Sequence, residues 1–211
     1  MLIQSCDDTS CPPDKKVGSI NISDTSLMFF PYDNDLTLVF KDNTGEEVSF
    51  KSNMGVKIEE LKLAVKYTCS ELKYDGRTSF EYLEGQYKSV LFSTVPEKFS
   101  FTISLFTEVL DREKRLFYDK LVIDLSSTGY IGRGEIVTDY RGNDSFKDKV
   151  MIDYPMEIMD SIVLNNKVYR DIYATELFDG EQFNRQVYFN KEKGLVGFKL
   201  DSTIYNLDRI E

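Results

Sequence analysis

The feature that most constrains the fold of this chain is the alternation of apolar and polar side chains in several separate segments. In residues 57–72, one face of a strand would carry Leu61, Leu63, Val65, Tyr67 and Cys69. A helix through the same residues would leave Leu63 and Tyr67 outside its apolar stripe, so a strand explains more positions. Residues 99–105 repeat the alternation, and we predict that both segments are β-strands.

Turn residues divide the chain into hairpins. Asp42-Asn43-Thr44-Gly45 separates two alternating segments, and Asn and Gly readily adopt the positive φ angles of a tight reversal. We predict a second hairpin in 79–93 with its turn at Glu84-Gly85-Gln86, and a third with its turn at 191–194. About twelve short strands with little helix predict an all-β fold: an antiparallel sandwich, a half-barrel or a large curved sheet.

Length and composition fit one principal domain. The 211 residues are 41% hydrophobic, which is enough for a packed core. Residues 7–16 are mostly polar and contain prolines, so we predict a lipobox remnant and flexible tether in 1–16 and a single β domain in 17–211. That domain begins with an edge strand near 17–23, and the Ser- and Gly-rich stretch 126–134 could join two lobes of it.

The composition excludes several classes of chemistry. The chain has no histidine, which removes Ser-His-Asp triads, Cys-His pairs and imidazole zinc sites. It also has no tryptophan, which weakens a carbohydrate platform, although tyrosine can stack in the same way. A formal net charge of −10 argues against nucleic acid, because phosphate backbones require clustered Lys and Arg. The basic residues of 111–115 are interleaved with carboxylates, as on a solvated surface.

Carboxylates are the main remaining chemical groups, but their spacing matches no known site. Candidates for a glycosidase acid and nucleophile are Asp75, Glu81 and Glu84 in one group, and Asp179 and Glu181 in another. Candidates for calcium ligands are Asp33, Asn34 and Asp35 in one group, and Asp139, Asn143 and Asp144 in another. Acids in solvated turns explain all four groups, so we predict no catalytic residue, no metal and no cofactor.

The N-terminus carries a partial lipoprotein pattern. Leu2-Ile3-Gln4-Ser5-Cys6 has the order of a lipobox, in which Cys6 would be lipidated after signal cleavage. Five residues before a cysteine are too few for a working signal peptide, so the alternative is a cytosolic start that matches by chance. No apolar run approaches the ~20 residues that span a bilayer, so we expect any membrane attachment to use a lipid.

The other two cysteines are Cys11 and Cys69. They could form a disulfide between the N-terminal segment and the first strands, which an oxidising envelope would permit. The alternative is an exposed thiol at Cys11 and a small buried side chain at Cys69, because sequence alone does not place the two Cα atoms.

Both ends of the chain resemble one group of proteins. The segments 161–173 and 187–198 combine a Tyr-rich strand, a Lys-x-x-Gly turn and a Leu-Val-x-Phe strand. This ending resembles that of many uncharacterised Bacteroidetes lipoproteins, and Asp7 and Asp8 after Cys6 resemble the export signal of surface-displayed members. The resemblance implies a location in the cell envelope, as an outer-membrane or surface-exposed lipoprotein, and no activity.

Three functions remain as hypotheses. The first is a non-catalytic envelope lipoprotein that acts as a binding or interaction module, with a protein or glycan partner and a membrane contact through its lipid. The second is a carboxylate-dependent hydrolase of glycans, which requires a cleft with two facing acids. The third is a lipid or lipoprotein carrier, which requires an apolar tunnel.

Overall fold

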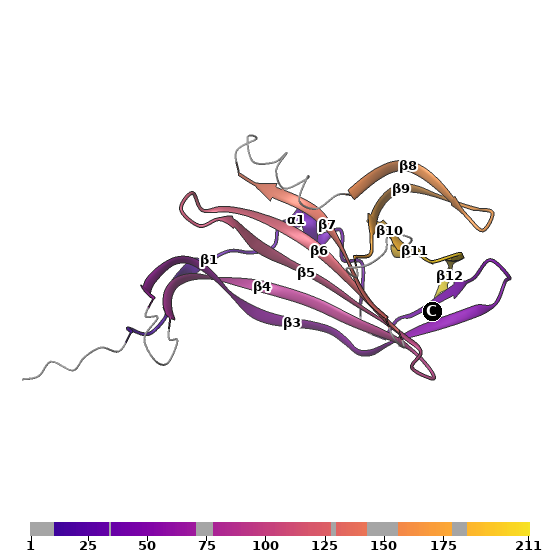
Figure 1. Cartoon of the computed structure of the whole chain (residues 1–211), viewed down its shortest axis with the longest axis horizontal. Helices are drawn as coiled ribbons and strands as arrows, with labels where there is room; N and C mark the ends of the chain where they lie inside the picture. Colours follow the sequence, from indigo (N-terminus) through magenta and orange to yellow (C-terminus); the bar gives the residue numbers. More distant parts are fainter. Residues whose placement is uncertain (1–10, 34, 71–77, 128–129, 143–155, 179–184) are drawn as a thin grey trace, which may run out of the picture.

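The computed structural model describes residues 11–33, 35–70, 78–127, 130–142, 156–178 and 185–211 (Figure 1). Within these ranges the chain forms twelve strands and one helix of four residues, α1 (Asp24–Leu27). The strands are β1 (Lys15–Ser19), β2 (Thr37–Lys41), β3 (Glu47–Ser70), β4 (Thr78–Thr94), β5 (Phe99–Asp111), β6 (Leu116–Ser127), β7 (Tyr130–Arg141), β8 (Met156–Leu164), β9 (Lys167–Glu176), β10 (Arg185–Asn190), β11 (Gly194–Leu200) and β12 (Thr203–Ile210). No helix in the described part of the chain is long and apolar enough to span a bilayer.

The strands form one sheet that curls into a nearly closed barrel. Their order is β7-β6-β5-β4-β3-β2-β12-β11-β10-β9-β8, and every pairing along this path is antiparallel. β1 lies off the path and pairs with β4 in parallel. The sheet bends far enough for β7 to meet the second residue after β9, where Arg133 and Phe178 exchange backbone hydrogen bonds of 3.2 and 2.9 Å. The predicted all-β fold with about twelve strands is confirmed.

The predicted hairpin in 79–93 is wrong, because β4 runs without interruption through Gly85. Gly85 is not a turn residue but lies opposite Leu61 in the neighbouring strand. A Cβ atom at Gly85 would lie 3.2 Å from Leu63 Cδ1, so glycine lets the leucine pack against the strand. The other two predicted turns are confirmed, with Gly45 and Gly194 at positive φ angles of 90° and 76°.

The interior of the curled sheet is filled by large apolar side chains. The fully buried ones with the largest volumes are Phe29, Phe40, Phe50, Phe92, Phe101, Phe189 and Phe198. Most of these alternate with polar residues along their strands, so each strand presents one apolar face to the inside. The Phe198 ring lies 4.9 Å from the Phe101 ring and 5.3 Å from the Phe40 ring, measured between centroids. These rings join strands from both halves of the sheet into one core.

Residues 20–32 pass through this interior, and their apolar side chains fill its centre. Ile22, Phe29, Phe30 and Tyr32 are buried there, and the Tyr32 hydroxyl accepts a hydrogen bond of 2.7 Å from the Leu195 N–H. The predicted edge strand near 17–23 is therefore shorter than expected, since β1 ends at Ser19. The chain then turns inward, and the Ser23 side chain caps α1 by accepting a 3.2 Å hydrogen bond from Ser26 N–H.

The β8–β9 hairpin covers the outer face of the sheet over β10–β12, as Figure 1 shows. Because side chains alternate, Gly197 lies on the face opposite to the buried Phe198. A Cβ atom at Gly197 would lie 2.5 Å from Leu164 Cδ1, so the tip of the hairpin packs directly on β11. The Tyr169 hydroxyl and the Asn165 side-chain amide then donate hydrogen bonds to the Leu207 and Ile204 carbonyls of β12.

Candidate functional site

The long strands β3 and β4 extend beyond the barrel as an arm, which curves away at one end of the molecule (Figure 1). β5 pairs with β4 only over Tyr87–Ser93, and β1 takes the same edge of β4 over Glu81–Glu84. We use "the arm" for β1 together with residues 57–70 of β3 and 78–86 of β4. Because β5 and β6 separate from β4 at this point, their connecting turn is left facing the end of β3.

The N-terminal segment is fastened to the arm by covalent and ionic contacts. Cys11 and Cys69 form a disulfide, with their Cα atoms 5.7 Å apart, a usual separation for such a bond. Asp14 accepts a hydrogen bond of 3.3 Å from the Lys62 ammonium and another of 3.3 Å from the Phe80 N–H. The sequence predicts a flexible tether for residues 11–16, but in the structure these residues are bound to the arm. Cys6 lies outside the described residues.

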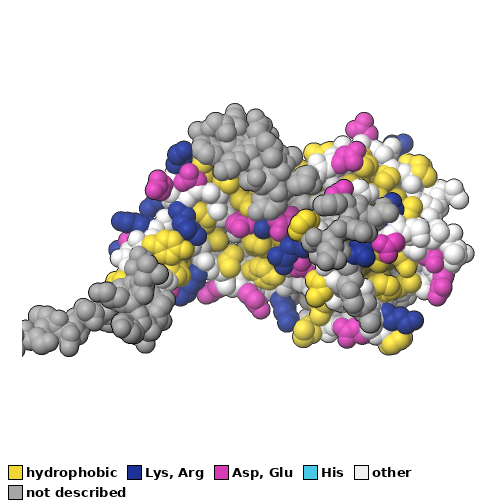
Figure 2. Space-filling view, viewed as in Figure 1, with side chains coloured by type: hydrophobic (Ala, Val, Ile, Leu, Met, Phe, Trp, Pro, Cys, Tyr) yellow, Lys and Arg dark blue, Asp and Glu magenta, His cyan; other side chains and the backbone are white. Residues whose placement is uncertain are grey.

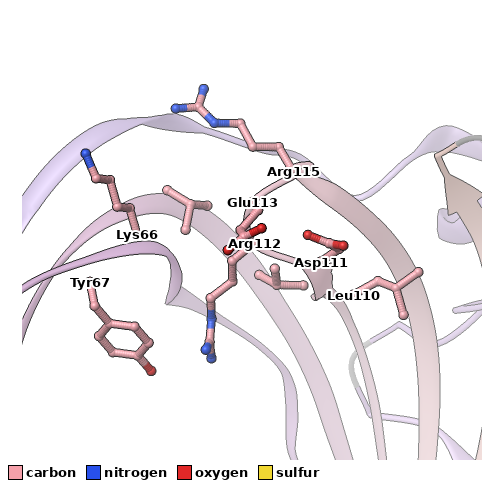
Figure 3. Close-up of a pocket in the computed structure, with 9 residues that line it drawn as sticks. Lys66, Tyr67, Leu110, Asp111, Arg112, Glu113 and Arg115 are labelled. Carbon is pink, nitrogen blue, oxygen red and sulfur yellow. The ribbon is translucent and has the colours of Figure 1, made fainter.

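A groove of about 860 Å³ lies between the arm and the β5–β6 turn (Figure 3). We call it the arm groove. Its lining residues come from the end of β3 and from both sides of the turn: Val65, Lys66, Tyr67, Val109, Leu110, Asp111, Arg112, Glu113 and Arg115. The apolar members lie deeper than the charged ones, because Val65 is buried whereas Arg112, Glu113 and Arg115 are exposed. The groove thus has an apolar base and a charged rim.

Tyr67 is the aromatic side chain of the groove and is 50% exposed. The Arg112 guanidinium lies 4.9 Å from the centre of its ring, within the distance of a cation–π contact. Figure 3 shows Arg112 reaching from the turn toward Tyr67, so this pair spans the two walls. Phe80 packs edge-on against Tyr67, with centroids 6.4 Å apart, and supports the ring from the neighbouring strand.

The prediction that Tyr67 shares a strand face with Leu63 and Val65 is wrong. Simple alternation groups it with Leu63 and Val65, which are both buried. Register shifts in β3 between Ala64 and Lys66, and between Tyr67 and Cys69, each add a residue opposite β4. A bulge of this kind turns the following side chains to the other face, so Tyr67 points outward into the groove. Alternation alone carries no signal for such a bulge.

Most of the predicted carboxylate candidates do not form a site. Glu81 and Glu84 lie on opposite faces of β4, because they are three residues apart in an unbroken strand. Each carboxylate pairs with a lysine of β1: Glu81 with Lys15 at 3.8 Å and Glu84 with Lys16 at 2.5 Å. The remaining glycosidase candidates, Asp75, Asp179 and Glu181, lie outside the described residues.

The two predicted calcium groups are each only partly described. Asp33 and Asp35 are exposed and Asp139 is half-buried, while Asn34, Asn143 and Asp144 lie outside the described residues. Among the residues that the structure describes, no group of three or more His, Cys, Asp or Glu side chains is arranged to hold a metal ion.

The buried ionic groups of the barrel hold elements together. Asp119 is fully buried and accepts hydrogen bonds from the Thr107 hydroxyl at 2.6 Å, the Ser23 N–H at 2.9 Å and the Arg141 guanidinium. Burial raises the pKa of the Asp119 carboxyl, but these three donors outweigh it and hold the pKa below its ordinary value. Since Ser23 begins α1, this carboxylate ties the internal segment 20–32 to the sheet.

Lys120 forms a second buried ionic cluster, on the face of β6 opposite to Asp119. Its ammonium lies 2.6 Å from a Glu108 oxygen and 2.9 Å from a Glu135 oxygen, so it links β5, β6 and β7. Burial lowers the pKa of Lys120, but the hydrogen bonds to the two carboxylates outweigh it and the pKa is raised. Lys120 therefore remains charged at neutral pH and acts as a structural cation.

Comparisons with known proteins add no family. No protein-family model, no curated protein and no solved structure matches this chain.

Proposed function

We propose that the protein is a non-catalytic binding module of the cell envelope and that the arm groove is its ligand site. The observation that carries this proposal is the groove itself, in which a half-exposed tyrosine lies under a guanidinium on an apolar base. Binding sites typically combine an apolar lining with a few polar groups that fix orientation. The partner is a protein or a glycan that occupies this groove.

The charged groups of the groove favour binding over hydrolysis. Its two carboxylates, Asp111 and Glu113, come from the same turn and not from facing walls. Asp111 accepts a hydrogen bond of 2.9 Å from Lys114 N–H and thereby shapes the turn. A glycosidase requires two carboxyl groups on either side of the scissile bond, so this arrangement supports a binding role. The filled interior of the barrel likewise favours a binding module over a lipid carrier.

The envelope location is supported by the Cys11–Cys69 disulfide, because such bonds persist in oxidising compartments. A lipid on Cys6 would place the membrane five residues before this disulfide. Intact-mass analysis of protein isolated from its native membranes tests both features. We expect an acyl adduct on the Cys6 peptide and a protein two hydrogens lighter than its reduced form. A native protein that lacks both the adduct and the disulfide contradicts the envelope location.

Binding is tested with arrays of soluble polysaccharides and envelope proteins, probed with the intact protein. We expect at least one retained ligand, whose affinity falls at least about tenfold in Tyr67→Ala because the ring that it contacts is lost. Ile58→Ala is a matched control, since Ile58 is an exposed apolar residue of the same arm outside the groove. The proposal fails if no ligand is retained, or if Tyr67→Ala and Ile58→Ala bind every ligand equally well.

A further inference from the structure

We propose that the ligand of the arm groove is an acidic oligosaccharide, whose isolated carboxylate or sulfate groups are bound by Lys66, Arg112 and Arg115. This inference rests on the proposed function and specifies its ligand class. It requires three properties of the groove: unsatisfied positive charge, an aromatic surface for a sugar ring, and acceptors for sugar hydroxyls.

The first property is a local group of cations that form no ion pair with a described carboxylate. Among the described residues, no carboxylate lies within ion-pair distance of Lys66, Arg112 or Arg115. Three other lysines of the arm differ, because Lys15, Lys16 and Lys62 pair with Glu81, Glu84 and Asp14. Figure 2 shows Lys and Arg side chains at the end of the molecule where the arm lies, with Asp and Glu side chains between them. In a chain with a net charge of −10, three cations in one groove that pair with no described carboxylate favour an anionic ligand.

The second property is the exposed Tyr67 ring, which lies beside one of these cations, Arg112. In Figure 3 the Lys66 and Arg115 side chains extend to one side of the groove, while Arg112 extends toward Tyr67. A guanidinium group donates two parallel hydrogen bonds to two oxygens of one anionic group, which suits a planar carboxylate or a tetrahedral sulfate. The Tyr67 ring is amphipathic and can pack against the C–H face of the same sugar.

The third property separates a saccharide from a simple anion. Glu113 and the Tyr67 hydroxyl lie in the same lining and can accept hydrogen bonds from sugar hydroxyls. A carboxylate in the site would repel inorganic phosphate or a densely charged polymer. The net charge of −10 also opposes polyanions, whereas a sugar chain with spaced charges meets less repulsion. Three cations beside two carboxylates, Asp111 and Glu113, leave a small positive excess in the lining, which suits a sparsely charged oligosaccharide.

The experiment is calorimetric titration of the intact protein with a hyaluronan oligosaccharide, which carries one carboxylate per two sugars, and with a chito-oligosaccharide of the same length as the neutral probe. We expect the acidic probe to bind at least about tenfold more tightly. Its affinity should fall by about tenfold in Arg112→Gln and in Lys66→Gln, because each variant removes one charged donor. Lys15→Gln is the matched control: it changes the net charge equally on the same arm, and it should leave the affinity within about twofold.

Salt gives an independent readout. Raising NaCl from about 0.1 M to about 1 M shortens the Debye length from about 10 Å to about 3 Å, so binding of the acidic probe should weaken while Tyr67 still contributes. Equal affinity for both probes, or equal loss in Lys15→Gln and Arg112→Gln, overturns the inference. Binding of an acidic peptide in place of both sugars also overturns it. If one of these results is found but some ligand still binds in a way that depends on Tyr67, only the inference about acidic sugars fails. If no ligand depends on Tyr67, the proposed binding function fails as well.

Discussion

Replacing Asp119 with alanine is expected to lower the free energy of unfolding by about 3 kcal/mol, because removal of one partner of a buried ion pair leaves the other uncompensated. Arg141 would lose its carboxylate partner, and the Thr107 hydroxyl and the Ser23 N–H would each lose an acceptor. Urea unfolding followed by far-UV circular dichroism measures the effect. Asp124→Ala is the control, since Asp124 forms an ion pair with Arg133 at the surface and its loss should cost less than about 1 kcal/mol.

The same carboxylate predicts how stability depends on pH. The folded-state pKa of Asp119 is below its unfolded-state value, so its stabilising contribution is fully present above the unfolded-state pKa of about 3.9. The contribution is lost as the pH falls through the folded-state pKa. The difference in stability between the native protein and Asp119→Asn should therefore shrink below about pH 4. A difference that stays constant down to pH 2 would show that Asp119 is not the titrating group.

Replacing Phe198 with alanine is expected to cost about 3–5 kcal/mol, because the cavity that it leaves lies at the centre of the aromatic core. Phe198 is fully buried, and its ring stacks on the Tyr205 ring with centroids 4.4 Å apart. The same urea unfolding measures this loss. Phe178→Ala removes a ring that is 63% exposed and should change stability by less than about 1 kcal/mol. If both variants lose the same stability, the placement of Phe198 at the centre of the core is wrong.

The strands were predictable where alternation and turn residues agree. β2, the start of β3 and their turn at Asp42–Gly45 follow from local sequence, as does the β10–β11 turn at Gly194. The same reasoning failed at Gly85, because a glycine inside a strand and a glycine in a turn look alike in sequence. The structure distinguishes them only through Leu63, which packs where a Cβ atom would be.

The internal segment 20–32 could not be predicted, because its position depends on contacts distant in sequence. Ser23 meets Asp119 and Tyr32 meets Leu195, over separations of 96 and 163 residues. Apolar residues such as Phe29 and Phe30 indicate burial, but not that the chain enters the barrel. The closure between Arg133 and Phe178 is equally non-local.

The arm groove escaped sequence analysis for two reasons. Tyr67 changes face at a bulge, and Arg112 lies in a turn whose mixed charges are typical of a solvated surface. The groove forms because β5 and β6 separate from β4 at the point where β1, in place of β5, pairs with the edge of β4. Among the candidate residues that the structure describes, Cys11 and Cys69 are the pair that it brings together.

The most direct test of the account is the location of bound ligand on the folded protein. Backbone amide NMR spectra are recorded during titration with the ligand that the arrays retain most strongly. We expect the shifted amides to belong to residues 65–67 and 109–115, on the two walls of the arm groove. The control surface, where we expect no shifted amides, is the exposed apolar surface of the β8–β9 hairpin at Ile158, Val163 and Val168. Shifts confined to that hairpin, with none in the groove, would contradict the account.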